Sequence, residues 1–187
     1  KKITFQNDKK NERLGYIVEN SKLSKILQNK LLRKKNVDLF YNSKILNIET
    51  NNQFGKVLLE NKTIKSKLII AADGKNSLTA KMIGNRTYKK IYPEKALVLN
   101  FFHEKKLHNT AYEIFYKNGP LAILPMKATK GFFRSSLIWT NKKKYNDQLI
   151  NSSDEFIKNI VEEKIFNITG KITKINSKQN FPLSAHL

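Results

Sequence analysis

The sequence has no cysteine among its 187 residues, so no framework of disulfide bonds can hold the fold together. This absence fits a reducing compartment. The apolar runs are all far shorter than the roughly 20 residues that a membrane-spanning helix needs, so we expect no helix to cross a bilayer. The chain starts with neither a methionine nor the layout of a signal peptide. We therefore expect a fragment of a longer protein.

Several patterns of chemically active residues are missing as well. The histidines, His103, His108 and His186, have neither metal-ligand spacing nor an accompanying carboxylate pattern, and we expect surface or structural roles for them. No Ser-His-Asp order and no phosphate-binding loop occurs in the sequence. The sequence therefore predicts no metal site, and it names no catalytic residue.

Acidic residues are scarce: 15 of them face 36 lysines and arginines, which gives a net charge of +21. Such a charge invites a nucleic-acid interpretation. However, arginine, which recognises bases and phosphates through two hydrogen bonds, occurs only at Arg13, Arg33, Arg86 and Arg134. The abundance of lysine, asparagine and isoleucine is what an A/T-rich coding sequence would give. We favour compositional drift and expect no nucleic-acid partner, with a functional basic surface as the alternative.

Helices are predicted where apolar residues recur at helical spacing, and strands where they alternate. The predicted helices cover 21–34 with Ser21 as N-cap, 77–83 closed by Gly84, and a segment from Ser153 whose buried stripe is Phe156, Ile157, Ile160, Val161 and Ile165. The predicted strands lie at 3–6, within 37–48, and at 56–60, 63–66, 95–102, 110–116, 121–125, 132–140 and 171–175. Because the later strands follow one another through short connections, they indicate an antiparallel sheet.

The run from Leu68 to Ala72 is the most informative part of the chain. It is apolar and too short for a helix, so it predicts a buried strand of a parallel sheet, and ligands collect at the carboxyl ends of such strands. Asp73 stands at this end, where an acid can accept a hydrogen bond from a sugar hydroxyl, and Gly74 allows a turn or a close approach. The alternative is an ordinary turn whose aspartate caps the following helix.

Asp73-Gly74, the preceding run and Ser77 resemble the second flavin fingerprint of group A flavoprotein aromatic hydroxylases. Further segments resemble, in the same order, parts of the ubiquinone-biosynthesis hydroxylases of that group: 14–20, 118–125, 134–140 and 181–185. Together these ordered motifs are far more specific than any one of them. The resemblance extends from about residue 14 to the end of the chain.

Parts of the family pattern are missing from the sequence. It has no glycine-rich strand-turn-helix to seat the flavin pyrophosphate, and the family's Gly-Asp motif would follow Leu187. The arginine of the fingerprint is replaced by Ala80, with Lys81 beside it. We therefore expect a central fragment of the enzyme that is inactive by itself.

The resemblance implies a mixed α/β fold. We expect part of a doubly wound FAD-binding domain at 1–87, an antiparallel substrate-binding sheet with a packed helix at 88–180, and the return to the FAD domain at 181–187. The implied cofactor contacts are Asp73 to the FAD ribose, Gly74 through close approach, and Asn20 facing the ribityl chain, unless Asn20 only starts its helix. Candidate substrate contacts are Phe115, Leu124 and Trp139, with the alternative that they are core residues.

The implied activity is FAD-dependent hydroxylation of an aromatic ring with NAD(P)H as reductant. The implied substrate is a polyprenylated phenol of ubiquinone biosynthesis. A cytoplasmic location follows, with peripheral contact at the inner face of the membrane and an assembly with other enzymes of ubiquinone synthesis. Two alternatives stay open: a non-catalytic basic module that binds nucleic acid or an anionic membrane, and an interaction fragment of a degraded or split gene.

Overall fold

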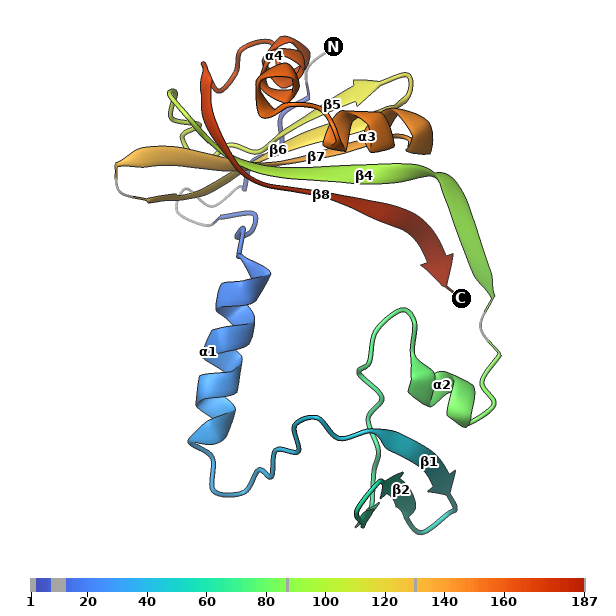
Figure 1. Cartoon of the computed structure of the whole chain (residues 1–187). Helices are drawn as coiled ribbons and strands as arrows, with labels where there is room; N and C mark the ends of the chain where they lie inside the picture. The colour runs from blue at the N-terminus through green and yellow to red at the C-terminus, as the bar shows by residue number, and fades with distance from the viewer. Residues whose placement is uncertain (1–2, 8–12, 87, 130, 187) are drawn as a thin grey trace. The chain divides into compact units, whose positions relative to one another are not determined.

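The computed structural model describes residues 3–7, 13–86, 88–129 and 131–186, and it has the expected mixed α/β class with antiparallel sheets (Figure 1). The chain divides into two compact units. One contains residues 1–24 and 91–183, and the other contains residues 25–90 and 184–187. The division expected near residue 87, which follows domain boundaries of the family, stays a prediction.

The larger unit is built on a five-stranded sheet with the strand order β5-β6-β7-β4-β8. Its strands are β4 (Lys89–His103), β5 (Tyr112–Tyr116), β6 (Gly119–Thr129), β7 (Phe132–Lys142) and β8 (Ile172–His186). The pairs β5–β6, β6–β7 and β7–β4 are antiparallel, which confirms the arrangement predicted from the short connections.

Burial alternates along the central strands, because α3 (Lys143–Ile150) and α4 (Asp154–Lys164) cover one face of the sheet (Figure 1). The covered face supplies most of the core: Leu97, Leu99 and Phe101 of β4, Leu121 and Ile123 of β6, and Leu137 and Trp139 of β7, against Leu149, Ile157, Val161 and Ile165. The intervening residues point the other way and are only half-buried. We call that side the open face; it includes Val98, Asn100, Phe102, Leu124, Arg134, Ser136 and Ile138.

Helix α4 begins where its sequence predicts. Ser153 is the N-cap, and its Oγ accepts a hydrogen bond from the Phe156 N–H at 3.3 Å. The predicted buried stripe is correct at Ile157, Val161 and Ile165, which are fully buried, but Phe156 is 52% exposed. The fully buried residues recur every four positions, so they form one stripe, and Phe156 lies beyond its edge.

Helix α3 was not predicted, because a polar side chain holds it in place. Asn146 is fully buried, and its Nδ2 donates to the Lys95 carbonyl at 2.8 Å and to the Trp139 carbonyl at 3.1 Å. Leu149 is the other buried residue of this helix. A helix with so few buried apolar residues leaves little periodicity for the sequence to show.

The smaller unit contains an antiparallel three-stranded sheet and a short helix. The strands are β1 (Ile45–Thr50), β2 (Gly55–Leu59) and β3 (Thr63–Ser66), and the helix is α2 (Leu78–Met82). The predicted β2–β3 hairpin and the predicted α2 are confirmed. Asn51 makes the β1–β2 turn, since its Oδ1 accepts from the backbone N–H groups of Gln53 and Phe54, each at 2.9 Å.

The strand predicted at 68–72 is not formed. Leu68 and Ile70 are 73% and 79% exposed, and this run has no regular structure. A parallel strand needs a neighbouring strand, and among the described residues none pairs with this run. The strand predictions at 3–6 and 37–41 are wrong for the same reason, since alternation alone supplies no pairing partner.

Helix α1 (Asn20–Leu32) is confirmed, but it starts one residue before the predicted N-cap Ser21, which lies inside the helix. Its apolar stripe is not buried: all 13 of its residues are described, and each is exposed. Within the described ranges, no helix is long and apolar enough to cross a membrane.

Replacement of Ile157 by alanine should destabilise the chain by about 2–5 kcal/mol, because it opens a cavity between α4 and the sheet. The measurement is urea unfolding followed by circular dichroism. Phe156→Ala, which removes more atoms from the adjacent but exposed position, is the control and should change the free energy of unfolding by about 0.5 kcal/mol or less. Equal losses in the two variants would contradict the packing of α4.

Candidate functional site

The Asp73-Gly74 turn leads directly into α2, and the carboxylate of Asp73 holds the start of that helix. Oδ1 accepts a hydrogen bond from the Ser77 hydroxyl at 2.6 Å, and Oδ2 accepts from the Thr79 backbone N–H at 3.0 Å. Ser77 in turn is the N-cap of α2, because its Oγ accepts from the Ala80 N–H at 2.9 Å. Asp73 thus performs the helix-capping role that the sequence left open as an alternative.

These hydrogen bonds leave acceptor capacity on the same carboxylate. The Ser77 hydroxyl, followed by the Thr79 backbone N–H, lowers the pKa of Asp73 from 3.8 to about 2, so the group is fully charged near neutral pH. A carboxylate offers about four lone-pair positions, and the two hydrogen bonds use about half of them. Because Asp73 is exposed, the remaining lone pairs can accept hydrogen bonds from a ligand.

Gly74 has the backbone conformation for which glycine is suited. Its φ is +78°, and a β-carbon placed there would meet nothing within 4 Å. The requirement for glycine is therefore conformational, and the space beside the backbone is open. The C-cap of α2 is Ile83, one residue before the predicted Gly84, which follows in a similar left-handed conformation with a φ of +73°.

Asn20 is exposed and is the first residue of α1. It belongs to the unit of the large sheet, whereas Asp73 and Gly74 belong to the other unit. A joint flavin site formed by Asp73, Gly74 and Asn20 therefore stays a prediction.

The candidate substrate contacts separate onto the two faces of the large sheet. Trp139 is 3% exposed and lies in the core, where its ring meets that of Tyr145 at a centroid distance of 5.5 Å. Leu124 is half-buried on the open face, directly after the buried Ile123, and Phe115 is 80% exposed on the edge strand β5. Trp139 is therefore a core residue, which is the alternative stated for it from the sequence. Phe115 and Leu124 remain candidate substrate contacts on the open face.

Polar residues that the sequence analysis missed stand in the middle of the open face. Asn100 Nδ2 donates to Ser177 Oγ at 2.9 Å, and Ser136 lies opposite Asn100 in the β4–β7 register. Val98, Ile138 and Leu124 are neighbours of this polar group in the same registers. Alternation within 134–140 did not single out Ser136, because Arg134 and Thr140 share its face with Ile138.

An ion pair that the sequence gave no reason to expect lies at one end of the open face. The Arg134 guanidinium donates to both carboxylate oxygens of Glu19, at 3.2 and 3.3 Å. The Lys22 ammonium also donates to this carboxylate. Lys22 and then Arg134 hold the pKa of Glu19 below its usual range.

The histidines have no catalytic arrangement in the part of the chain that the structure describes. His103 is 3% exposed, its Nε2 lies 2.9 Å from Ser135 Oγ, and its ring stacks on Phe133. Burial lowers its pKa, so the ring is neutral near pH 7. These contacts confirm a structural role for His103, and no cluster of potential metal ligands occurs among the described residues.

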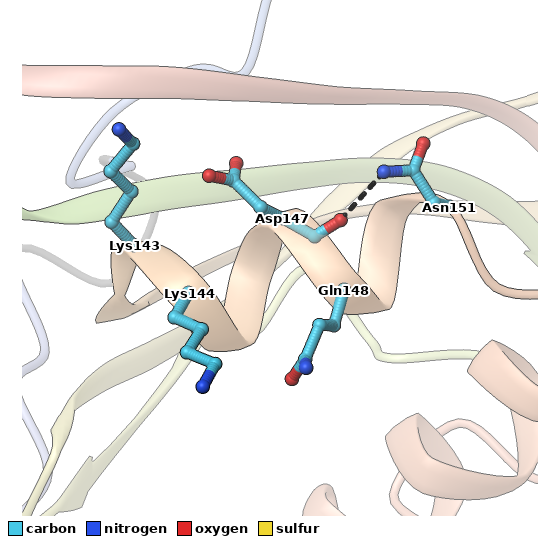
Figure 2. Close-up of a pocket in the computed structure, with 5 residues that line it drawn as sticks. All are labelled: Lys143, Lys144, Asp147, Gln148 and Asn151. Atoms are coloured by element: carbon cyan, nitrogen blue, oxygen red, sulfur yellow. Dashed lines mark hydrogen bonds between the residues drawn. The ribbon is translucent and has the colours of Figure 1, made fainter.

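A surface pocket beside α3 has a different character. The residues that line it have charged or amide side chains and come from α3 and its C-cap: Lys143, Lys144, Asp147, Gln148 and Asn151 (Figure 2). Asn151 donates to the Asp147 carbonyl at 2.8 Å, and Lys95 binds the Asp147 carboxylate at 2.5 Å. With no aromatic or aliphatic side chain in its lining, this pocket does not suit an apolar ring.

Replacement of Ser77 by alanine should raise the pKa of Asp73 from about 2 toward its ordinary value of 3.8, because the hydroxyl is the main cause of the depression. The stabilising effect of Asp73 is present above pH 3.8 and is lost as the pH falls through about 2. A carboxyl NMR titration measures the pKa directly. Ser43→Ala, at an exposed serine bonded to the Tyr41 carbonyl, is the control and should leave the titration unchanged.

Comparison with known proteins relates this geometry to a family. No protein-family model matches the chain. The chain is 29% identical over 164 residues to the mitochondrial ubiquinone biosynthesis monooxygenase COQ6 of Danio rerio, with 82% of this chain and 33% of that protein covered. It is 30% identical over 130 residues to the ubiquinone hydroxylase UbiL of Rhodospirillum rubrum, with 69% and 29% covered. The chain thus spans about a third of the length of these curated relatives.

Solved structures show the same fold. The flavin-dependent halogenase CmlS matches 90% of this chain with a TM-score of 0.66 and 14% identity, and the match covers 32% of that protein. The p-nitrophenol 4-monooxygenase PnpA of Pseudomonas putida matches 89% of the chain with a TM-score of 0.63 and 14% identity, covering 42% of that protein. The chain is therefore similar to the ubiquinone-biosynthesis hydroxylases over most of its own length, and its fold is that of the flavin-dependent monooxygenases.

Proposed function

We propose that this chain is the central part of an FAD-dependent monooxygenase that hydroxylates a polyprenylated phenol in ubiquinone biosynthesis. The observation that carries the proposal is the exposed, charged carboxylate of Asp73 beside Gly74, in a chain related to ubiquinone hydroxylases over most of its length. Its remaining lone pairs suit a ribose hydroxyl, and the open space at Gly74 suits close approach of the cofactor. The residues present therefore fit the ribose end of FAD.

In this proposal the protein binds and orients, and the cofactor supplies the redox chemistry. FAD, when bound and reduced by NAD(P)H, activates oxygen for transfer to the ring. Asp73 and Gly74 hold the ribose, and Asn20 faces the ribityl chain. This division of work explains why no acid–base pair stands out in the chain.

The open face of the large sheet is the proposed substrate wall. Its half-buried apolar residues, Val98, Leu124 and Ile138, suit an aromatic ring. The Asn100–Ser177 hydrogen bond and the nearby Ser136 place donors and acceptors among them, which suits a ring that carries a hydroxyl group. We propose that Phe115, which is exposed on the edge strand, contacts the prenyl chain.

The exposed apolar surfaces support the idea that further segments of the protein cover this part. Leu23, Ile26, Leu27 and Leu31 recur at helical spacing on α1, yet each is at least 41% exposed. Leu68 and Ile70 are exposed to a still greater extent. Exposed apolar residues gathered on one helix face or one short run are often covered by another part of a protein. We infer that a glycine-rich strand-turn-helix, which would seat the pyrophosphate, precedes this chain in the gene.

In this proposal, the net charge of +21 attracts the protein to anionic lipid. A polyprenylated phenol lies in a bilayer, and each basic residue near anionic lipid contributes about 1 kcal/mol of attraction. We propose peripheral contact with the inner face of the membrane for a cytoplasmic enzyme, in an assembly with other enzymes of ubiquinone synthesis. The alternative function is a basic module that binds nucleic acid or membrane without catalysis.

Replacement of Asp73 by alanine in the protein with its flanking segments should weaken FAD binding by about tenfold, because the charged acceptor for the ribose is lost. The dissociation constant and the yellow flavin absorbance measure this loss. Asp38→Ala, at an exposed aspartate of the same unit, is the control and should bind FAD normally. An unchanged FAD affinity in Asp73→Ala would exclude the ribose contact.

The 187-residue chain alone should purify colourless, because it has no glycine-rich segment to seat the pyrophosphate. Absorbance at the flavin bands measures this, and stoichiometric bound FAD would contradict it. The same sample tests the alternative function. Binding to duplex or single-stranded nucleic acid that falls steeply with salt, on logarithmic axes, would favour the basic module.

A further inference from the structure

We propose that Arg134 is a positioning residue that fixes the start of α1, and with it Asn20, against the open face of the large sheet by binding Glu19. Glu19, Asn20 and Arg134 all lie in the same compact unit. The part of this inference that concerns Asn20 and the flavin rests on the proposed function. The part that concerns the start of α1 rests on the ion pair alone.

Burial shows that Glu19 is the anchor of its segment. Residues 13–36 are all described, and every one of them is exposed except Glu19. The side chain of Arg134 is 10% exposed and that of Glu19 is 26% exposed. In most segments an apolar side chain makes such a contact, but Leu14, Tyr16 and Val18 are each more than half exposed. The segment is therefore held at its most buried point by a pair of charges.

The geometry of the pair fixes orientation as well as distance. Two guanidinium nitrogens of Arg134 bind the two carboxylate oxygens of Glu19, and such a planar, two-fold arrangement cannot rotate freely. The backbone carbonyl of Glu19 accepts the Leu23 N–H at 3.0 Å, which is the first hydrogen bond of α1. The same residue thus starts the helix and attaches it to the sheet. Asn20 is its direct neighbour in the chain.

Arg134 is itself held rigidly. It lies in β7, between Phe102 of β4 and Met126 of β6 in the register of the sheet. Its guanidinium carbon lies 5.8 Å from the Phe102 ring centroid, and one of its nitrogens donates to Thr129 Oγ1 at 3.2 Å. Because both terminal nitrogens already have partners, the side chain is placed for support and not for substrate contact.

A double-mutant cycle on Arg134→Gln and Glu19→Gln tests the ion pair without the cofactor. In the 187-residue chain, amide hydrogen exchange at Leu23 should accelerate about fivefold in either single variant, and the double variant should show little further change. Arg134→Lys keeps the charge but loses the two-fold geometry, so its exchange should lie between wild type and Arg134→Gln. Arg33→Gln, at an exposed arginine, is the control and should be unchanged. Additive effects, or an unchanged rate at Leu23, would overturn the inference.

The link between Asn20 and the flavin is tested with the same variants in the protein with its flanking segments. Arg134→Gln and Glu19→Gln should each weaken FAD binding by about fivefold, again without additivity in the double variant. Faster exchange at Leu23 with unchanged FAD affinity would overturn the link to Asn20. Weaker FAD binding with unchanged exchange would overturn positioning and indicate direct contact. If the wild-type protein binds no FAD, the proposed function fails and the link to Asn20 falls with it, whereas the exchange measurement still decides whether Arg134 holds α1.

Discussion

The assignment of side chains to the open face of the large sheet depends on the packing of α4 against the opposite face. Ile157, Val161 and Ile165 are fully buried and cover one set of alternating residues. Because side chains alternate along a strand, covering that set leaves the other set on the open face. A slip of one residue in β7 would bring Ile138 into the core in place of Trp139 and would turn Arg134 away from Glu19. The open face and the anchor of α1 therefore have one common cause.

The sequence predicted those parts of the fold whose partners are close in the chain. The β2–β3 hairpin, the antiparallel pairs β5–β6 and β6–β7 and the Ser153 cap each depend on residues close in the chain, and each is confirmed. The run 68–72 has the apolar composition of a buried strand, but composition cannot supply a pairing partner. Helix α3 escaped prediction for the opposite reason, since a buried asparagine holds it where periodicity would require apolar side chains.

The same distinction between contacts close in the chain and distant contacts applies to the candidate site. The turn at Asp73-Gly74 and the glycine at the end of α2 are local, so the sequence was sufficient to predict them. The sequence could not assign Phe115, Leu124 and Trp139 to one face of the sheet, because alternation separates two faces without identifying the covered one. Arg134 and Glu19 lie 115 residues apart, and nothing in either segment indicates the other. Sequence reasoning thus placed the Asp73-Gly74 turn and missed the contact that holds the start of α1.

Because acidic residues are scarce, the carboxylates that have specific partners are the informative ones. With 15 acidic residues and 36 basic residues, an exposed acid is easily near a lysine, so an exposed ion pair with lysine says little about stability or function. Glu19 differs, since it lies between Lys22 and one of only four arginines, and these cations lower its pKa. The pKa of Asp73 is lowered as well, by a hydroxyl and a backbone N–H. Both contributions are present at neutral pH and are lost on acidification through the lowered pKa values. Acid should therefore release the start of α1 and the Asp73 turn.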